Sequence, residues 1–489
     1  MRKYGFIKTA SACPRLKVAD TSYNLRNIES LIDQAETYGV SVMVFPELSI
    51  TSYTCGDLFG QDLLIKSAED KVRELCEFMK SKDMLVFVGA PVPVNQYLFN
   101  CAIAIQKGSI LGIVPKTFIP NYSEFYEKRW FSSSMDWSGD HVKYCGLDVP
   151  FGCDILFQDE DMEEFCVGVE ICEDLWSPVP PSSYAAVSGA CVVANLSASN
   201  ELVNKASYRK ELVKQQSARL VCAYVYSSSG VDESSTDMVF SGHQIISENG
   251  IVLNESERFR RDSYMITADV DLKKLSSERR KDLTFRDSMD CLRKSFRKVK
   301  FSQVERQYSN FDRAVTPNPF VPSDPNHRDE RCSEIFNIQV AGLAKRQEHT
   351  GIKKAVLGIS GGLDSTLALL VTVKTFDLLG LSRNDIITVT MPGFGTTDRT
   401  YSNALTLCRA LCTDLREINI KDAGHDPEIL DVTYENVQAR ERTQILMDLA
   451  NKDKGLVVGT GDLSELALGW STYNGDHMSM YGVNCSVPK

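Results

Sequence analysis

Short apolar runs alternate with amphipathic stretches along about the first 270 residues of the chain. The stretches at 24–38 and 62–80 place apolar residues three and four positions apart, which predicts helices with one buried face. Runs of five or six mostly apolar residues predict buried strands at 40–45, 85–90, 101–105 and 191–195. Strands that alternate with helices predict an α/β fold built in layers.

A second alternation begins near Asp329. Strands are predicted at 355–359, 386–391 and 455–459 with helical stretches between them, as in a doubly wound parallel sheet. A strongly charged stretch at 272–300 and four prolines at 316–327 come before it, and both are typical of a solvated connecting segment. The sequence therefore predicts a first unit at 1–271, a linker at 272–328 and a second unit at 329–489.

Composition and charge narrow the class of protein. The 489 residues are 43% hydrophobic and 24% charged, which is ordinary for a globular protein. The net charge of −11 argues against bulk attraction to nucleic acid or to an anionic membrane. No apolar stretch predicts a membrane span or a signal peptide. The 15 cysteines form no CxxC pair, which favours a reducing, cytoplasmic location.

The strand at 355–359 runs into Ser-Gly-Gly-Leu-Asp-Ser, residues 360–365, and a helical stretch follows at once. Glycines let the backbone approach a ligand closely, and the N–H groups at a helix start favour a phosphate. Ser360 and Ser365 add hydroxyl donors, and Asp364 offers a carboxylate to a magnesium ion. The spacing is neither that of the Walker loop nor that of the GxGxxG fingerprint. The alternative is an ordinary glycine-rich turn.

Three predicted strands of the first unit end on reactive side chains. Glu47 follows an apolar run, Lys116 follows a second and Cys172 follows a third. Strand ends at one sheet edge are where α/β folds gather such groups. A carboxylate that takes the thiol proton, a cysteine that attacks and an ammonium that stabilises the resulting anion make a nucleophilic site without histidine. Taken singly, each residue is more often a packing or solvated residue.

The sequence around these residues resembles the nitrilase (carbon–nitrogen hydrolase) superfamily. Its three signatures match Phe45-Pro46-Glu47-Leu48, Pro115-Lys116 and Glu170-Ile171-Cys172-Glu173-Asp174-Leu175-Trp176. The resemblance covers nearly all of residues 1–270. It implies an αββα sandwich, an acyl-enzyme thioester on Cys172, and an oxyanion hole formed by Lys116 and nearby backbone N–H groups.

The segments at 121–131 and 194–199 resemble one branch of that superfamily, the glutaminase domain fused to an NAD synthetase. This resemblance implies a glutamine pocket. Tyr122 and Glu173 would line it, Ser199 would lie near the α-amino group, and Arg209 could face the α-carboxylate. The implied glutamine-binding residues are Tyr122, Phe125, Glu173, Ser199 and Arg209.

The turn at 360–365 resembles the SGGxDS pyrophosphate loop of ATP pyrophosphatases, which split ATP into AMP and pyrophosphate. The resemblance implies an adenine-nucleotide-hydrolase-like second unit. A Met-Pro turn at 391–397 is similar to the loop that contacts adenosine in this family. The implied ATP-binding residues are Ser360, Gly361, Gly362, Asp364, Ser365, Met391 and Thr460.

Two further segments are similar to NAD synthetases, namely Asn-Val-Gln-Ala-Arg at 436–440 and the run from 460 to 476. They imply a magnesium ion on Asp364 and Glu465. On spacing alone, Asn436 and Arg440 could equally form a solvated helix face. The implied residues for deamido-NAD, the substrate that carries nicotinic acid, are Asn436, Arg440, Trp470, Tyr473 and Asp476.

These resemblances predict glutamine-dependent synthesis of NAD, with ATP, glutamine and deamido-NAD as substrates, Mg²⁺ as cofactor and a homo-oligomer as the assembly. Other SGGxDS amidotransferases fit less well, because position 2 is Arg2 rather than cysteine and no histidine lies beside the Cys172 segment. The second unit is short for the family, so it is expected to be incomplete at its carboxyl end. A glutaminase joined to an inactive nucleotide-binding unit therefore stays open.

Overall fold

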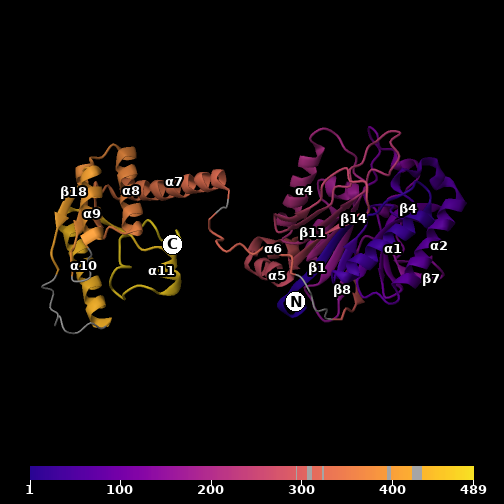
Figure 1. Cartoon of the computed structure of the whole chain (residues 1–489), viewed down its shortest axis with the longest axis horizontal. Helices are drawn as coiled ribbons and strands as arrows, with labels where there is room; N and C mark the ends of the chain where they lie inside the picture. Colours follow the sequence, from indigo (N-terminus) through magenta and orange to yellow (C-terminus); the bar gives the residue numbers. More distant parts are fainter. Residues whose placement is uncertain (293, 305–310, 322–323, 394–397, 421–431, 489) are drawn as a thin grey trace. The chain divides into compact units, whose positions relative to one another are not determined.

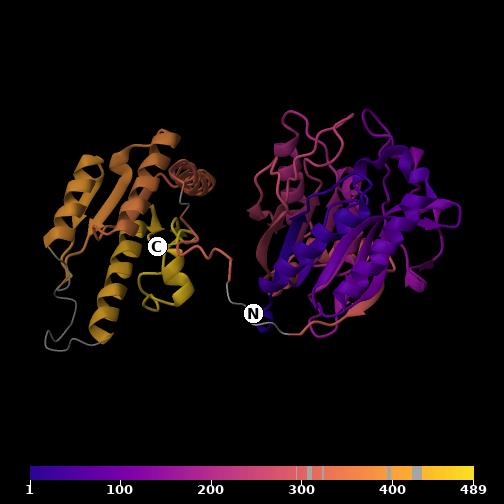
Figure 2. The ribbon, with the colours of Figure 1, turned by 45° about the vertical axis from the view of Figure 1, so that its right-hand side comes forward.

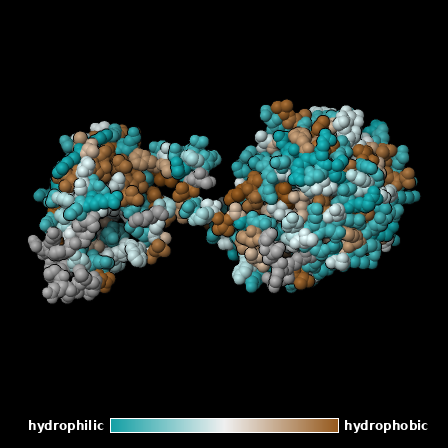
Figure 3. Space-filling view, in the orientation of Figure 1, coloured by the Kyte–Doolittle hydropathy of each residue, from teal (hydrophilic) through white to brown (hydrophobic). Residues whose placement is uncertain are grey.

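The computed structural model describes the chain except residues 293, 305–310, 322–323, 394–397, 421–431 and 489. The chain forms two compact units, unit 1 at Met1–Ala314 and unit 2 at Val315–Lys489. Each unit has hydrophobic clusters of its own. Polar residues cover most of the face of unit 1 that is visible in Figure 3, because its apolar residues lie between layers. No helix within the described ranges is long and apolar enough to cross a lipid bilayer.

Unit 1 contains two large sheets. The first has the strand order β14-β1-β2-β3-β4-β5, and the second has the order β13-β12-β11-β10-β9-β8-β15. In the first sheet the bounds are β1 Phe6–Cys13, β2 Val42–Val44, β3 Leu85–Val94, β4 Tyr97–Gln106, β5 Ser109–Pro115 and β14 Tyr264–Asp271. In the second they are β8 Ile155–Asp159, β9 Cys166–Ile171, β10 Val192–Ser197, β11 Ala223–Ser228, β12 Ile245–Glu248, β13 Ile251–Glu255 and β15 Arg297–Phe301. A small hairpin joins β6 His141–Tyr144 to β7 Leu147–Pro150.

The two sheets face each other and helices cover their outer faces. One apolar cluster contains Val44 and Phe87 of the first sheet together with Val169 and Leu196 of the second. Helices α1 (Thr21–Thr37) and α2 (Asp62–Met79) pack on the first sheet, while α3 (Pro181–Val187) and α4 (Lys205–Arg219) pack on the second. Figure 1 shows α4 on one side of the strands and α1 and α2 on the other. The αββα sandwich expected from the sequence is confirmed.

The charged stretch at 272–300 is part of unit 1 rather than a linker, so that prediction was wrong. It forms α5 (Leu272–Lys281), α6 (Leu283–Cys291) and β15, which pairs with β8 at the edge of the second sheet. The charges conceal an amphipathic pattern, because Leu272, Leu275, Phe285 and Phe301 are buried in the core between the sheets. Unit 1 extends to Ala314, and unit 2 begins at Val315.

Arg279 shows how one of these charges serves the fold. Its guanidinium donates hydrogen bonds to the backbone carbonyls of Ala190 (2.7 Å), Leu220 (2.8 Å) and Val221 (3.0 Å). These carbonyls lie at the entrances to β10 and β11. The sequence alone does not distinguish an arginine that donates to backbone carbonyls from an arginine that is exposed to water.

Unit 2 is a doubly wound parallel sheet, as the sequence predicts. The strand order is β18-β17-β16-β19-β20, and every pair of neighbours is parallel. Helices lie on both faces of the sheet (Figure 2). The strands are β16 Lys354–Gly358, β17 Ile386–Thr390, β18 Asp414–Glu417, β19 Gly455–Gly459 and β20 Tyr481–Gly482. The helices are α7 Pro325–Thr350, α8 Leu363–Leu379, α9 Asp398–Ala410, α10 Val432–Asp453 and α11 Leu463–Leu468.

The proline-rich stretch ends inside a helix rather than before one. Pro325 is the first residue of α7, where its missing N–H costs nothing. Asp324 caps the helix by accepting a hydrogen bond from the N–H of Asn326. Unit 2 therefore begins before Asp329, the start expected from the sequence.

Replacing Arg279 with alanine should lower the free energy of unfolding of unit 1 by about 2 to 3 kcal/mol, because three buried carbonyls lose a charged donor. Urea denaturation followed by tryptophan fluorescence measures the change. Arg280→Ala is the matched control, since among the described residues Arg280 bonds only to Ser276 on its own helix. Equal unfolding midpoints for the two variants would show that Arg279 does not stabilise unit 1 through these carbonyls.

Candidate active site

Three buried side chains meet where strands of the two facing sheets end. Glu47 follows β2, Lys116 follows β5 and Cys172 follows β9. Glu47 and Lys116 have no exposed surface, and Cys172 is 6% exposed. The backbone N–H of Glu47 donates to the carbonyl of Ser197 at the end of β10, which ties the two sheets together at this point. The structure thus brings together the three residues that the sequence predicts to be catalytic.

Lys116 lies between two carboxylates. Its Nζ is 2.7 Å from Oε1 of Glu47 and 2.8 Å from Oε1 of Glu127. Asn100 donates to the same oxygen of Glu47 at 2.6 Å, and the Tyr53 hydroxyl donates to Glu127 at 2.7 Å. The other oxygen of Glu47 has no hydrogen-bond partner within the described ranges. That oxygen is the one able to take a proton from a neighbouring group.

The charges of the site influence one another strongly. Burial raises the pKa of Glu47 to about 7, although Lys116 opposes the shift. Burial and the nearby Glu47 raise the pKa of the Cys172 thiol, so this thiol is neutral at neutral pH. Burial lowers the pKa of Lys116, but Glu127 and Glu47 outweigh this effect and keep the ammonium charged. A neutral thiol beside a carboxylate of pKa about 7 is suited to general base catalysis.

The turn that carries Cys172 is held in an unusual backbone conformation. Cys172 has φ of 45°, in the left-handed region that side chains other than glycine rarely adopt, and it begins the short 3-10 helix Cys172–Trp176. Asp174 accepts hydrogen bonds from the backbone N–H groups of Ile171 (2.9 Å) and Phe118 (2.8 Å). This carboxylate joins the nucleophile turn to the loop that follows Lys116, a role that the sequence did not indicate.

Three of the residues expected to bind glutamine, Tyr122, Phe125 and Glu173, lie close to one another. The Tyr122 hydroxyl donates to the Glu173 carboxylate at 3.0 Å. Phe125 is buried, and the Nζ of Lys205 lies 5.6 Å from the centre of its ring. A pocket of about 180 Å³ opens beside Phe125 and is also lined by Tyr53 and Glu127.

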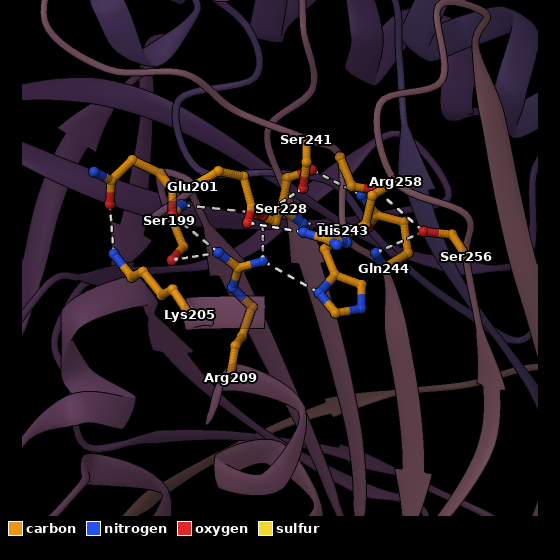
Figure 4. Close-up of polar contacts among 12 residues, drawn as sticks. Ser199, Glu201, Lys205, Arg209, Ser228, Ser241, His243, Gln244, Ser256 and Arg258 are labelled. Atoms are coloured by element: carbon orange, nitrogen blue, oxygen red, sulfur yellow. Dashed lines mark hydrogen bonds and ion pairs between the residues drawn. The ribbon is translucent and has the colours of Figure 1, made fainter. Parts of the chain in front are cut away.

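Lys205 and Arg209 lie one helical turn apart on α4 (Figure 4). They differ in burial. Arg209 has no exposed surface and donates to Ser199 Oγ at 3.2 Å and Glu201 Oε1 at 2.7 Å. Lys205 is half-buried, and its charge is close enough to Cys172 to interact with it. Burial lowers the pKa of Lys205. The sequence singled out Arg209 as the cation that faces the substrate, but Lys205 is the one on the accessible side.

In unit 2 the turn at 360–365 links β16 to α8. The hydroxyls of Ser360 and Ser365 are 3.1 Å apart, and the N–H of Gly362 donates to Ser360 Oγ at 3.3 Å. Gly361 has φ of 80°, and an added Cβ would lie 2.0 Å from the carbonyl oxygen of Thr400. Only glycine fits at that position.

Three carboxylates gather beside this turn. Ligand oxygens of Asp364, Asp462 and Glu465 all lie within 4.8 Å of one another. Asn484 donates to the backbone carbonyls of Asp364 (2.9 Å) and Thr460 (3.1 Å), so it joins the ends of the two loops. Three hard oxygen donors at this spacing fit a magnesium ion. The sequence predicted Asp364 and Glu465 as ligands but missed Asp462, which caps α11 three residues before Glu465.

The residues expected to bind deamido-NAD form a second group in unit 2. Thr472 donates to Asn436 Oδ1 at 2.8 Å, and its N–H donates to Asp476 at 2.9 Å. Arg440 donates to the carbonyl of Tyr473 at 3.1 Å. The structure therefore places α10 against the loop at 470–476.

The side chains around this second group differ in exposure. Trp470 is 80% exposed and Tyr473 is 77% exposed, so both rings are available to a ligand. Met391 is buried after β17. Residues 394–397 of the predicted adenosine turn lie outside the described residues.

Comparisons with known proteins give a family match for each of the two units. A carbon–nitrogen hydrolase model matches residues 8–280, and an NAD synthase model matches residues 335–482. The chain is 43% identical to the glutamine-dependent NAD(+) synthetase of Mycobacterium leprae over 99% of its own length and 74% of that protein's. It is 41% identical to the enzyme of the same name from Mycobacterium tuberculosis, over 100% of its own length and 74% of that protein's.

Among solved structures, the glutamine-dependent NAD(+) synthetase of Cytophaga hutchinsonii matches 97% of this chain and 78% of its own, with 22% identity and a TM-score of 0.48. Unit 1 is a carbon–nitrogen hydrolase unit by its fold and by its family match, and unit 2 is an NAD synthase unit. With relatives above 40% identity over the whole of its length, the chain belongs to the family of glutamine-dependent NAD(+) synthetases.

The rate at which iodoacetamide alkylates Cys172 should rise with pH through about 7, the pKa to which burial raises Glu47. Below that pH Glu47 is protonated and cannot accept the thiol proton. In Glu47→Gln the rise near neutrality should vanish and the rate should fall on the order of a hundredfold, because burial still keeps the thiol protonated.

Peptide mass spectrometry measures this alkylation and reports the exposed Cys153 in the same sample as an internal control. Alkylation of Cys153 should not differ between the two proteins. A Glu47→Gln variant whose Cys172 reacts as fast as that of the wild type at neutral pH would rule out Glu47 as the base.

Proposed function

We propose that this chain makes NAD from deamido-NAD, using ATP to activate the nicotinate carboxylate and glutamine as the source of nitrogen. The single observation that carries the proposal is the buried Glu47–Lys116–Cys172 cluster, present in one chain with the 360–365 turn and its carboxylates. The first cluster is built to release ammonia from an amide, and the second to bind the phosphates of a nucleotide. The names of the related enzymes support the same reaction.

In unit 1 the chemistry is acyl transfer through Cys172. Glu47 takes the thiol proton while sulfur attacks the δ-carbonyl carbon of glutamine. The oxyanion is stabilised by the Lys116 ammonium, and the C–N bond breaks as Glu47 returns the proton to the departing ammonia. Water then attacks the thioester with Glu47 again as base, which releases glutamate and restores the thiol. A pKa of about 7 lets Glu47 act in both directions.

Glutamine would be oriented by its two charged ends. The Glu173 carboxylate, held by Tyr122, would accept the α-ammonium group. Lys205 would meet the α-carboxylate, because it is half-buried on the Cys172 side of α4. Ser199 and Phe125 would complete the pocket. Arg209 would hold the segment at 199–201 in place by hydrogen bonds rather than contact the substrate.

In unit 2, ATP would place its phosphates on the turn formed by Ser360, Gly361, Gly362 and Ser365. Asp364, Asp462 and Glu465 would hold a magnesium ion, which would supply positive charge to the phosphates. The nicotinate carboxylate attacks the α-phosphorus, pyrophosphate departs, and ammonia then displaces AMP from the acyl adenylate to give the amide. Met391 and Thr460 are the remaining residues proposed for ATP.

Deamido-NAD would lie where α10 meets the loop at 470–476. Asn436 and Arg440 are anchored to that loop by their contacts with Thr472 and Tyr473. The exposed rings of Trp470 and Tyr473 offer stacking surfaces for the pyridine ring or adenine. Asp476 braces the loop through the Thr472 N–H.

The direct experiment is mass spectrometry of products formed from deamido-NAD, ATP and glutamine that carries a heavy nitrogen in its amide. NAD that contains the heavy nitrogen, together with AMP, pyrophosphate and glutamate, is expected. Glutamate without NAD, even when ammonia is supplied, would instead favour a glutaminase with an inactive nucleotide-binding unit.

Cys172→Ala should abolish glutamine-driven NAD synthesis and leave ammonia-driven synthesis near the wild-type rate, because the thiol is needed only to release ammonia. Parallel assays of NAD with glutamine or with an ammonium salt measure both activities. Cys153→Ala, at an exposed cysteine, is the matched control and should retain both. Equal loss of the two activities in Cys172→Ala would refute the two-site scheme.

Glu465→Gln should raise the magnesium concentration needed for half-maximal ammonia-driven synthesis on the order of tenfold, because one of three oxygen ligands loses its charge. Titration of the metal-free protein with MgCl₂ measures this concentration. Glu348→Gln on the exposed face of α7 is the control. An unchanged magnesium requirement in Glu465→Gln would remove this residue from the metal site.

A further inference from the structure

A fully buried arginine lies behind the wall of the proposed glutamine pocket. Arg209 uses four of its N–H groups (Figure 4). Nη2 donates to Ser199 Oγ at 3.2 Å and to the carbonyl of Asn200 at 3.0 Å. Nη1 donates to Glu201 Oε1 at 2.7 Å and lies 3.1 Å from Nδ1 of His243. The remaining donor, Nε, has no partner within the described ranges.

The three acceptors at 199–201 belong to the segment that leaves β10 and passes the nucleophile. The backbone N–H of Ala198, one residue earlier, lies close enough to the Cys172 sulfur to lower the pKa of the thiol, against the larger effect of burial. Asn200 accepts a hydrogen bond from Lys205, the proposed partner of the substrate carboxylate. Arg209 therefore fixes the segment that positions both the sulfur and one end of glutamine.

His243 completes this arrangement as a hydrogen-bond acceptor. An arginine side chain has donors and no acceptor, so the Nδ1 atom that faces Arg209 must carry a lone pair. The proton must then be on Nε2, which lies 2.9 Å from Glu255 Oε1 and donates to it. The contacts on both sides of the ring are compatible only with the neutral imidazole.

Protonation of His243 would set an N–H against the N–H of Arg209 and break that bond. The charged groups that face the ring are Arg209 from α4, Glu255 from β13 and Glu201 from the segment after β10. Farther out, Lys210 pairs with Glu255 at 2.6 Å and Arg258 pairs with Glu201 at 3.1 Å. Burial, aided by Arg209, lowers the pKa of His243, and the two glutamates oppose this without reversing it.

We propose that His243 is a positioning residue: as a neutral imidazole it holds Arg209, and through Arg209 it keeps the 198–201 segment in the form that binds glutamine. This inference rests on the glutamine hydrolysis proposed for unit 1. When the imidazole is protonated, one guanidinium N–H loses its acceptor, and the segment relaxes away from Cys172 and Lys205. The affinity for glutamine therefore falls as the pH drops below the ordinary pKa of histidine, about 6.5.

The test compares His243→Asn and His243→Ala with the wild type. Asparagine keeps an acceptor near the Nδ1 position and does not titrate, whereas alanine removes the acceptor. His141→Asn changes an exposed histidine and is the matched control. The KM and kcat for glutamine hydrolysis are measured from about pH 5 to about pH 8. Protonation of Glu173, whose pKa burial raises, contributes equally in every protein, so the readout is the difference between variants.

At neutral pH, His243→Ala should raise the KM for glutamine on the order of tenfold and lower kcat by less, while His243→Asn stays within about twofold of the wild type. In acid, the KM of the wild type and of His141→Asn should rise more steeply than that of His243→Asn. Parallel acid profiles for the wild type and His243→Asn would overturn the proposal, and so would an unchanged KM in His243→Ala. Absence of hydrolysis by the wild type would instead refute the proposed function itself.

Discussion

Everything in unit 1 depends on keeping one ammonium and two carboxylates out of water. Lys116 has no exposed surface and lies within 3 Å of both Glu47 and Glu127. A buried charge is tolerable only when its partners are held in place, and the partners here come from the loops that follow different strands. Burial is the main reason why the pKa of Glu47 is raised to about 7; Lys116 opposes the shift and the charge of Glu127 adds to it. A carboxylate with this pKa is suited to accept a proton near neutral pH.

Unit 2 also brings carboxylates close together, but no side chain of the protein is proposed as the cation that compensates their charge. Asp364, Asp462 and Glu465 converge within 4.8 Å, and like charges at that spacing favour a bound cation. In unit 1 the protein supplies its own cation as Lys116, which stays with the site through the reaction. In unit 2 the proposed cation is a metal ion, which Asp364, Asp462 and Glu465 would hold. Each cluster of carboxylates is therefore matched to the charge that develops in its own reaction.

Support for the first cluster extends well behind it. Asp174 ties the turn of Cys172 to the loop after Lys116, while Arg209 ties down the segment at 199–201. His243 holds Arg209 in turn, and it can do so only while it is neutral. None of these three residues needs to touch the substrate, but together they set the position of the nucleophile, of its backbone N–H donor and of the pocket wall.

The amino-acid sequence by itself located the proposed nucleophile, base and ammonium and the glycine turn of unit 2, because each of them follows an apolar strand and such boundaries are local. Tertiary structure decided the rest. Residues 272–301 carry so many charges that the sequence does not reveal the burial of Leu272 and Phe285. Only the folded structure shows that Arg279 donates to backbone carbonyls instead of water. Lys205 and Arg209 are one helical turn apart on α4, so periodicity assigns both to the same face. Which of them meets a substrate is set by depth of burial, a property of the packed layers that no single segment of the chain contains.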